Sequence, residues 1–168
     1  LEIGVYRGQV ISLWALVAKE LNMTCEIHGI SPFTSAGDEV SAYISNINYY
    51  EDVINNFNYF SLSLPMLHKG LSTDTGMIDV IKSKKWDFVY IDGSHDYDVV
   101  KNDFDVCSSM LSSNGIIILD DSAFYNGFKS PAYSSVGHHG PSRLADEIDK
   151  DIFKEVLSVG HNRVFQKK

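Results

Sequence analysis

Short apolar runs alternate along this chain with amphipathic stretches of helical spacing, which is typical of an α/β protein with a parallel sheet. The clearest run covers residues 88–91 and is followed by the turn residues Asp92-Gly93-Ser94. Its short length and its β-branched and aromatic side chains predict a buried central strand. A second apolar run, at residues 116–119, ends in Asp120 and Asp121. The pattern therefore predicts two buried strands that both end in carboxylates.

The same pattern predicts the order of the other elements. Further strands are expected at residues 1–3, 25–30 and 65–70, and a closing hairpin at residues 153–159 and 163–166. Helices are expected at residues 9–21, 38–60, 77–83, 99–111 and 143–149, the second either as one long helix or as two shorter ones. This order indicates an α/β fold with a Rossmann-like, doubly wound, mostly parallel seven-stranded sheet and a C-terminal antiparallel hairpin. No linker or repeat divides residues 1–168, so we expect a single domain.

Particular residues refine the boundaries of these elements. Asn114-Gly115 is expected to end the fourth helix, Ser142 to cap the fifth, and Ser72-Thr73-Asp74 to cap the third. The first helix is expected to bury one apolar face, formed by Val10, Leu13, Trp14, Val17 and Leu21.

Charge and cysteine content narrow the choice of partner. The chain has 168 residues and a formal net charge of -8, which suits one domain with a sizeable core. Neither nucleic acid nor an anionic membrane is expected as a partner, because both favour basic surfaces. Cys25 and Cys107 lie in apolar surroundings, so we expect reduced core thiols and a cytoplasmic protein. Because Leu1 already lies inside a predicted strand, we also expect that an N-terminal segment is missing.

A glycine-containing turn follows the first predicted strand. Gly4 and Gly8 flank Tyr6 between that strand and the first helix. Glycines there let the backbone approach a ligand, and the N-terminus of the following helix attracts negative charge. The full dinucleotide pattern is absent, because Tyr6 occupies the position of its middle glycine. An ordinary strand-to-helix turn remains an equal alternative for Gly4 and Gly8. At the end of the second predicted strand, Ser31 stands where a nucleoside site usually has an acid.

The two acidic strand ends suggest a working site. Ligands of open α/β sheets bind outside the carboxyl ends of the strands, where Asp92, Asp120 and Asp121 are expected to meet. His95 follows Asp92 by three residues on the same turn. The alternative is that each Asp only caps the turn or helix after it. Two such strands with a nearby histidine favour the working site.

Two further stretches are candidates for contact with a ligand. Residues 122–141 are rich in Ser, Gly, Tyr and Pro and contain His138-His139, and a loop of this length could cover the acidic site. A group of aromatic residues could line a substrate pocket, although such a stripe more often belongs to the core. These residues are Tyr49, Tyr50, Tyr59 and Phe60.

Three motifs resemble those of a known family. Residues 2–8, Glu-Ile-Gly-Val-Tyr-Arg-Gly, resemble the first motif of the class I S-adenosylmethionine-dependent methyltransferases, in which an acid precedes a glycine-rich turn. The closing antiparallel hairpin also resembles that fold. Residues 91–95, Ile-Asp-Gly-Ser-His, and residues 119–121, Leu-Asp-Asp, resemble the metal-dependent O-methyltransferases of the macrocin and mycinamicin type. The resemblance extends over nearly the whole chain, from Leu1 to Gln166.

This resemblance implies a set of cofactor contacts. Residues 4–8 would hold the methionine part of S-adenosylmethionine, and Glu2 would orient that turn or bind the amino group. Ser31 would lie by the ribose and Ser72 by the adenine, and Asp92 would also border the cofactor.

The resemblance also implies the reactive groups. Asp92, Asp120 and Asp121 would hold a divalent cation, with Mg²⁺ preferred because hard cations favour carboxylate oxygens. Such an ion can lower the pKa of a hydroxyl group. His95 would be the general base, since an unperturbed histidine has a pKa of about 6.5. The implied substrate is a hydroxyl group of a small molecule or sugar, and a homo-oligomer is possible.

Three other functions remain open at the level of sequence. A metal-dependent hydrolase could use the same acidic cluster, but it would not need the turn at residues 4–8. A nicotinamide oxidoreductase is opposed by Tyr6, by Ser31 and by the closing hairpin. A non-catalytic nucleoside-binding module could keep the fold without turnover.

Overall fold

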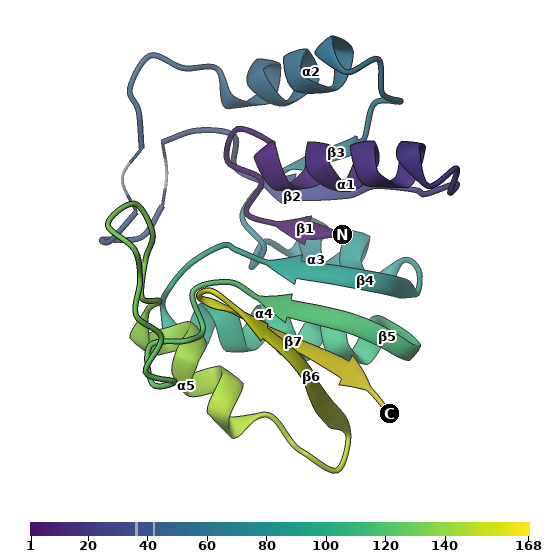
Figure 1. The fold of residues 1–168 in the computed structure, drawn as a ribbon. Coiled ribbons are helices and arrows are strands. Elements are labelled where there is room, and N and C mark those ends of the chain that lie inside the picture. The colour runs from purple at the N-terminus through teal and green to yellow at the C-terminus, as the bar shows by residue number, and fades with distance from the viewer. Residues whose placement is uncertain (36, 42) are drawn as a thin grey trace.

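The strands of the protein form one seven-stranded sheet (Figure 1). The computed structural model describes residues 1–35, 37–41 and 43–168. The strands are β1 (Glu2–Ile3), β2 (His28–Ser31), β3 (Met66–Lys69), β4 (Trp86–Ile91), β5 (Leu111–Leu119), β6 (Phe153–Val159) and β7 (Asn162–Lys167). Their order in the sheet is β3-β2-β1-β4-β5-β7-β6, and β7 runs antiparallel to both of its neighbours. The predicted Rossmann-like sheet with its closing hairpin is confirmed.

Helices cover the sheet in two layers. One layer consists of α1 (Gln9–Glu20) and α2 (Tyr49–Tyr59), and the other of α3 (Thr75–Lys82), α4 (Tyr97–Met110) and α5 (His139–Glu147). Figure 1 shows α3 and α4 behind the central strands, α5 at the lower left, and α1 in front of β2 and β3 with α2 above it. Helix α5 packs against α4, and α1 packs against α2. Among the described residues, no helix is long and apolar enough to cross a membrane.

The register of the parallel strands brings distant turns to one edge of the sheet. β1 lies between β2 and β4, with Ile3 opposite both Ile30 and Ile91. β4 pairs in turn with β5, with Ile91 opposite Leu119. Parallel strands end on the same side, so the turns that follow β1, β2, β4 and β5 are neighbours although they are far apart in the sequence.

The buried face of α1 differs from the predicted one. Ile11 and Ala15 are buried, whereas Leu13 of the predicted face is 56% exposed. Helix α1 approaches β2 so closely that a Cβ atom on Gly29 would lie 3.1 Å from Cδ1 of Ile11. Small side chains on the inner face permit this approach, and most of the larger apolar side chains point away. Of the predicted face, Trp14 packs edge-on against aromatic rings of β4.

The helix predicted at residues 38–60 is confined to its second half. Helix α2 begins after Asn48, whose side chain accepts a hydrogen bond from a backbone N–H in the first turn, and ends at Tyr59. Before it, the Asp38 carboxylate accepts hydrogen bonds from two following backbone N–H groups, and the Tyr49 hydroxyl binds the backbone of Ile44. These side-chain bonds compete with helix formation. Residue 42 of the predicted helix lies outside the described residues.

The predicted helix stop at Asn114-Gly115 is wrong. Helix α4 ends at Met110, and Leu111 already pairs with Trp86 of β4. Asn114 has a φ of 62° inside β5, where the register with β4 shifts. Asn114 and Gly115, which favour turns, therefore lie at an irregularity within strand β5 and not at the end of a helix.

Two further local predictions are corrected. Ser142 does not cap α5 but lies inside it, where its hydroxyl donates to the carbonyl of Asp121 and accepts from the N–H of Phe124. Cys25 is exposed and not a core thiol, whereas Cys107 is buried as predicted. Tertiary packing determines the position of Ser142 and the exposure of Cys25, and the local sequence pattern does not contain this information.

The assignment of the buried face of α1 can be tested by a matched pair of substitutions. Ile11→Ala removes a fully buried side chain and should lower the free energy of unfolding by about 2–5 kcal/mol. Leu13→Ala removes a mostly exposed one from the same helix and should change it by less than about 0.5 kcal/mol. Urea denaturation followed by circular dichroism measures both. Equal destabilisation by the two variants would contradict the observed orientation of α1.

Candidate active site

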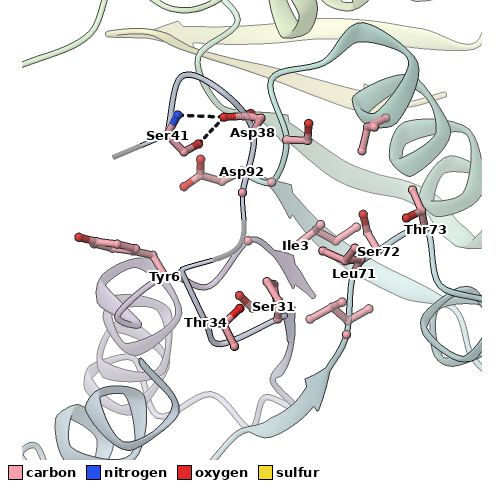
Figure 2. A pocket seen from close by; sticks show the side chains of 18 of the residues that line it. Ile3, Tyr6, Ser31, Thr34, Asp38, Ser41, Leu71, Ser72, Thr73 and Asp92 are labelled. Carbon is pink, nitrogen blue, oxygen red and sulfur yellow. Dashed lines mark hydrogen bonds between the residues drawn. The ribbon is translucent and has the colours of Figure 1, made fainter. Parts of the chain in front are cut away.

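A cavity of about 510 Å³ opens at the carboxyl ends of the parallel strands. Its walls come from the turns after β1, β2, β3 and β4 and from the loop before α2. Figure 2 shows Tyr6, Ser31, Ser72 and Asp92 around this space, each from a different segment. The volume is that of a small-molecule site. Six predicted site residues line the cavity, namely Gly4, Tyr6, Ser31, Ser72, Asp92 and His95.

The turn after β1 requires both of its glycines. Gly4 has a φ of +89°, and a Cβ atom there would lie 1.8 Å from the carbonyl oxygen of Asp92. Gly8 has a φ of +84° at the start of α1, where a Cβ atom would lie 3.0 Å from Val53 of α2. Gly4 lines the cavity and Gly8 does not. Helix packing therefore explains the glycine at position 8, and its contact with a cofactor stays a prediction.

Glu2 lies in the middle of the sheet, outside the cavity lining. It is 1% exposed, and its side chain accepts a hydrogen bond from the N–H of Ile11 in the first turn of α1. Its Oε2 atom has no hydrogen-bond partner among the described residues. Burial raises the pKa of Glu2 to about 8. The bond to Ile11 ties β1 to α1 across the glycine turn, which is the geometry needed to orient that turn.

The two predicted serines lie in the cavity wall. Ser31 is the last residue of β2 and is buried. Ser72 lies between β3 and α3, and its hydroxyl donates a hydrogen bond of 3.0 Å to Oδ2 of Asp103 on α4. Burial raises the pKa of Asp103 to about 6. This bond holds the loop after β3 against α4, and no motif in the sequence indicated it.

The three predicted carboxylates meet at the edge formed by β4 and β5. Burial, followed by the nearby carboxyl groups of Asp120 and Glu2, raises the pKa of Asp92 well above its usual range. Burial opposes ionisation of Asp121 as well, but hydrogen bonds from His95 and Ser135 and the charges of His138 and His161 together outweigh it and lower the pKa of Asp121.

His95 is held between two carboxylates. Its Nδ1 lies 2.7 Å from Oδ2 of Asp38, which also accepts a hydrogen bond from the His95 backbone N–H, and its Nε2 lies 3.0 Å from Oδ2 of Asp121. Burial lowers the pKa of His95, but the two carboxylates outweigh it and raise the pKa above the ordinary value. Asp38 is a site residue that sequence reasoning missed, because it was assigned to the start of a helix.

Two more histidines lie beside the acidic edge, which is the group of Asp92, Asp120 and Asp121 at the ends of β4 and β5. Nε2 of His138 lies 3.8 Å from Oδ2 of Asp121, and Nε2 of His161, in the turn between β6 and β7, lies 3.2 Å from Oδ1 of Asp120. The loop at residues 122–138 folds back on this edge, because the N–H of His138 donates to the carbonyl of Asp121. The sequence indicated His138 only through the long loop that contains it. His161 had no signal, since only the sheet order brings the hairpin turn beside β5.

The acidic edge has the donor groups of a cation site. The Oδ1 atoms of Asp120 and Asp121 are buried and have no hydrogen-bond partner among the described residues. Two groups could supply three ligand atoms within 4.8 Å of one another in the described part of the chain: Asp120, Asp121 and His161, or His95, Asp121 and His138. Unpaired buried carboxylate oxygens are costly unless a cation or proton neutralises them. The residues present therefore fit a bound divalent cation.

The aromatic residues considered as a pocket wall divide into two sets. Tyr49 is buried and lines the cavity, together with Tyr43. Tyr59 is 82% exposed, and Tyr50 and Phe60 are also exposed. One of the four predicted residues therefore belongs to this cavity wall.

The cavity, its glycine turn and the acidic edge define a cofactor-binding α/β enzyme site. A family model described as a methyltransferase domain matches residues 1–122. The chain belongs to this family of methyltransferase domains. No curated protein matches the sequence.

Solved methyltransferases share the fold. The O-methyltransferase NovP is 14% identical, with a TM-score of 0.70 over 99% of this chain and 70% of that one. A Bacillus cereus O-methyltransferase in complex with SAH is 14% identical, with a TM-score of 0.64 over 99% and 72%. CalS11, a TDP-rhamnose 3'-O-methyltransferase, is 15% identical, with a TM-score of 0.62 over 98% and 69%. The resemblance to class I methyltransferases is therefore confirmed in family and fold.

The buried carboxyl of Glu2 predicts a pH-dependent stability. Its pKa rises from 4.5 to about 8 on folding, so the folded state keeps a proton that the unfolded state releases. Stability from this group is present below about pH 4.5 and is lost as the pH rises toward 8. Glu2→Gln keeps the acceptor for Ile11 without the charge. The free energy of unfolding of the variant should rise relative to that of the parent by on the order of 1 kcal/mol per pH unit between pH 5 and 8.

Urea denaturation of both proteins across this pH range measures the difference. Lys19→Gln, which changes an exposed charge on α1, is the control and should run parallel to the parent. A constant difference between Glu2→Gln and the parent at all pH values would show that Glu2 is ionised in the folded state.

Proposed function

We propose that this protein is an S-adenosylmethionine-dependent O-methyltransferase that uses a divalent cation. The observation that carries the proposal is the position of the cavity, which borders the glycine turn at Gly4 on one side and His95 on the other. A cofactor bound along that wall would present its methyl group beside the acidic edge. Complexes of fold relatives with SAM or SAH support this choice of cofactor.

The cofactor would extend across the turns of the first three strands. In this arrangement the backbone at Gly4 and the side chain of Tyr6 contact the methionine part, while Glu2 holds the turn in place from below. Ser31 serves the ribose and Ser72 the adenine end, and both line the cavity. Ser31 replaces the acid that usually binds the ribose hydroxyls, and its hydroxyl can both donate and accept a hydrogen bond.

Asp92, Asp120 and Asp121 are the carboxylates that would hold the cation, and the orphaned Oδ1 atoms of Asp120 and Asp121 support the choice of these two residues. When bound, a divalent cation lowers the pKa of a hydroxyl group and positions it. Asp92 also borders the cofactor cavity, so the same strand end serves both sites.

His95 would remove the proton of the acceptor hydroxyl. Asp38 engages Nδ1, which leaves Nε2 as the atom directed to the acidic edge. When bound, S-adenosylmethionine would supply the methyl group of its sulfonium to the hydroxyl oxygen, and His95 in its neutral form would take the hydroxyl proton on Nε2. S-adenosylhomocysteine is then the product. Asp38 stabilises the imidazolium that results, as the carboxylate partner of a catalytic histidine does in general.

A sugar hydroxyl is the acceptor class that we favour. The analogy is with the macrocin and mycinamicin type and with CalS11, named as a TDP-rhamnose 3'-O-methyltransferase. Exposed aromatic side chains near the acidic edge, at Phe124 and Tyr125, offer flat apolar surfaces for a sugar ring. The free thiols Cys25 and Cys107 support a cytoplasmic location, where thiols stay reduced.

The cofactor assignment can be tested at Gly4. Gly4→Ala places a methyl group on the carbonyl of Asp92 and should lower the affinity for S-adenosylmethionine at least tenfold, about 1.4 kcal/mol. Gly76→Ala in α3 meets no atom within 4 Å and should keep the parental affinity. Calorimetric titration measures binding, and thermal unfolding confirms that each variant is folded. A parent protein that ignores the cofactor at millimolar concentration but binds NAD would contradict the proposal.

The general base can be tested with an acceptor found by screening sugar nucleotides for release of S-adenosylhomocysteine. His95→Ala should lower kcat by about a hundred- to ten-thousandfold, while the affinity for S-adenosylmethionine stays near that of the parent. His68→Ala is the matched control, because His68 contacts His28 in β2 and does not line the cavity. A near-parental kcat in His95→Ala would assign the base to another group.

A further inference from the structure

The turn between β6 and β7 brings a nitrogen donor to the acidic edge. Nε2 of His161 lies 3.2 Å from Oδ1 of Asp120, where the two side chains form an ion pair when the histidine is protonated. One ligand atom each from Asp120, Asp121 and His161 lies within 4.8 Å of the other two. The three-carboxylate set expected from sequence contains no such nitrogen. The imidazole changes the chemistry that this edge offers to a cation.

Contacts on its far side hold the His161 ring in this orientation. Nδ1 of His161 lies 3.2 Å from Oγ of Ser134, in the loop that covers the acidic edge. The carbonyl of His161 accepts a hydrogen bond of 2.7 Å from the N–H of Ser122, the residue after Asp121. A partner on one ring nitrogen that directs the other toward a metal is the usual outer support of a histidine ligand.

The two carboxyl groups of this set each have an unpaired oxygen. Oδ1 of Asp120 and Oδ1 of Asp121 are buried without a hydrogen-bond partner among the described residues. One carboxylate oxygen from each residue and an imidazole nitrogen lie within ligand distance of one another, which gives a set of three donors. A cation bound between them would satisfy all three groups at once.

The second candidate group is already occupied by internal contacts. Both ring nitrogens of His95 have carboxylate partners, at 2.7 Å on Asp38 and 3.0 Å on Asp121. The third member, His138, lies farther away, at 3.8 Å from Oδ2 of Asp121. An ion there would displace the hydrogen bond between His95 and Asp121, whereas an ion beside His161 would replace only the 3.2 Å contact between His161 and Asp120.

We propose that Asp120, Asp121 and His161 form a mixed oxygen and nitrogen site that prefers a first-row transition-metal dication to Mg²⁺. This inference rests on the proposed cation dependence of the enzyme and specifies the class of cation. Mg²⁺ favours oxygen ligands, whereas imidazole suits later first-row metals, whose affinity for mixed donor sets is higher. His95 is then not required as a ligand of the cation.

Co²⁺ is a suitable probe, because it binds mixed donor sets and its visible absorption reports its ligands. The full chain, stripped with EDTA and dialysed, is titrated calorimetrically with CoCl₂ and separately with MgCl₂. The parent should bind Co²⁺ at least about tenfold more tightly than Mg²⁺. His161→Gln should lose at least about tenfold in Co²⁺ affinity, change its visible spectrum, and bind Mg²⁺ nearly as the parent does. His138→Gln, the matched control on the other side of Asp121, should keep the parental Co²⁺ affinity.

Four results would overturn the inference, and they separate it from the proposed function. Equal affinity of the parent for both ions, or an unchanged Co²⁺ affinity in His161→Gln, would leave a carboxylate site and a cation-dependent enzyme. Loss of Co²⁺ in His138→Gln but not in His161→Gln would place the ion with His95 and His138. Failure of the parent to bind either ion would remove the cation from the proposed function too. Titration with S-adenosylmethionine then decides the cofactor assignment by itself.

Discussion

The site depends on the close approach of two backbone turns at the centre of the sheet. The turn after β1 passes so near the turn after β4 that no side chain fits at Gly4 against the carbonyl of Asp92. The N–H of Gly4 is bonded to the carbonyl of Ile30, which fixes the same turn to β2. Because β1 is the shared neighbour of β2 and β4, this contact sets the positions of the cavity wall and of Asp92 together.

A concentration of acidic groups at the sheet edge is the second constraint. Glu2 and Asp92 have raised pKa values because burial disfavours their charged forms, and the nearby carboxyl group of Asp120 adds to this effect at Asp92. Asp38 and Asp121 have lowered pKa values, because hydrogen bonds from their neighbours, His95 among them, outweigh burial. The edge therefore separates into carboxyl groups that favour a proton and carboxylates paired with histidine. Neighbouring groups with pKa values displaced in opposite directions are frequent in catalytic sites.

The elements that contribute directly to the sheet were largely predictable. The runs before Asp92 and Asp120 predicted β4 and β5, because a buried parallel strand must be apolar on both faces. Predictions failed where the local sequence is compatible with two conformations or with two orientations of the same helix. Helix α1 carries apolar residues on more than one face, and the close approach at Gly29 decides which face is buried. Residues 38–48 have helical spacing, but the Asp38 side chain bonds the backbone and His95 instead.

Of the site, the sequence by itself determined what lies at the ends of the strands. Gly4, Ser31, Asp92 and Asp120 are each fixed to a strand end by their position in the chain, and parallel strands end at one edge. Only the tertiary structure decided the partners that come from elsewhere. The order β5-β7-β6 places the hairpin turn with His161 beside Asp120, 41 residues away in the chain, and a loop outside any regular element carries Asp38 to His95. Such contacts depend on sheet order and loop path, which no local pattern of polar and apolar residues encodes.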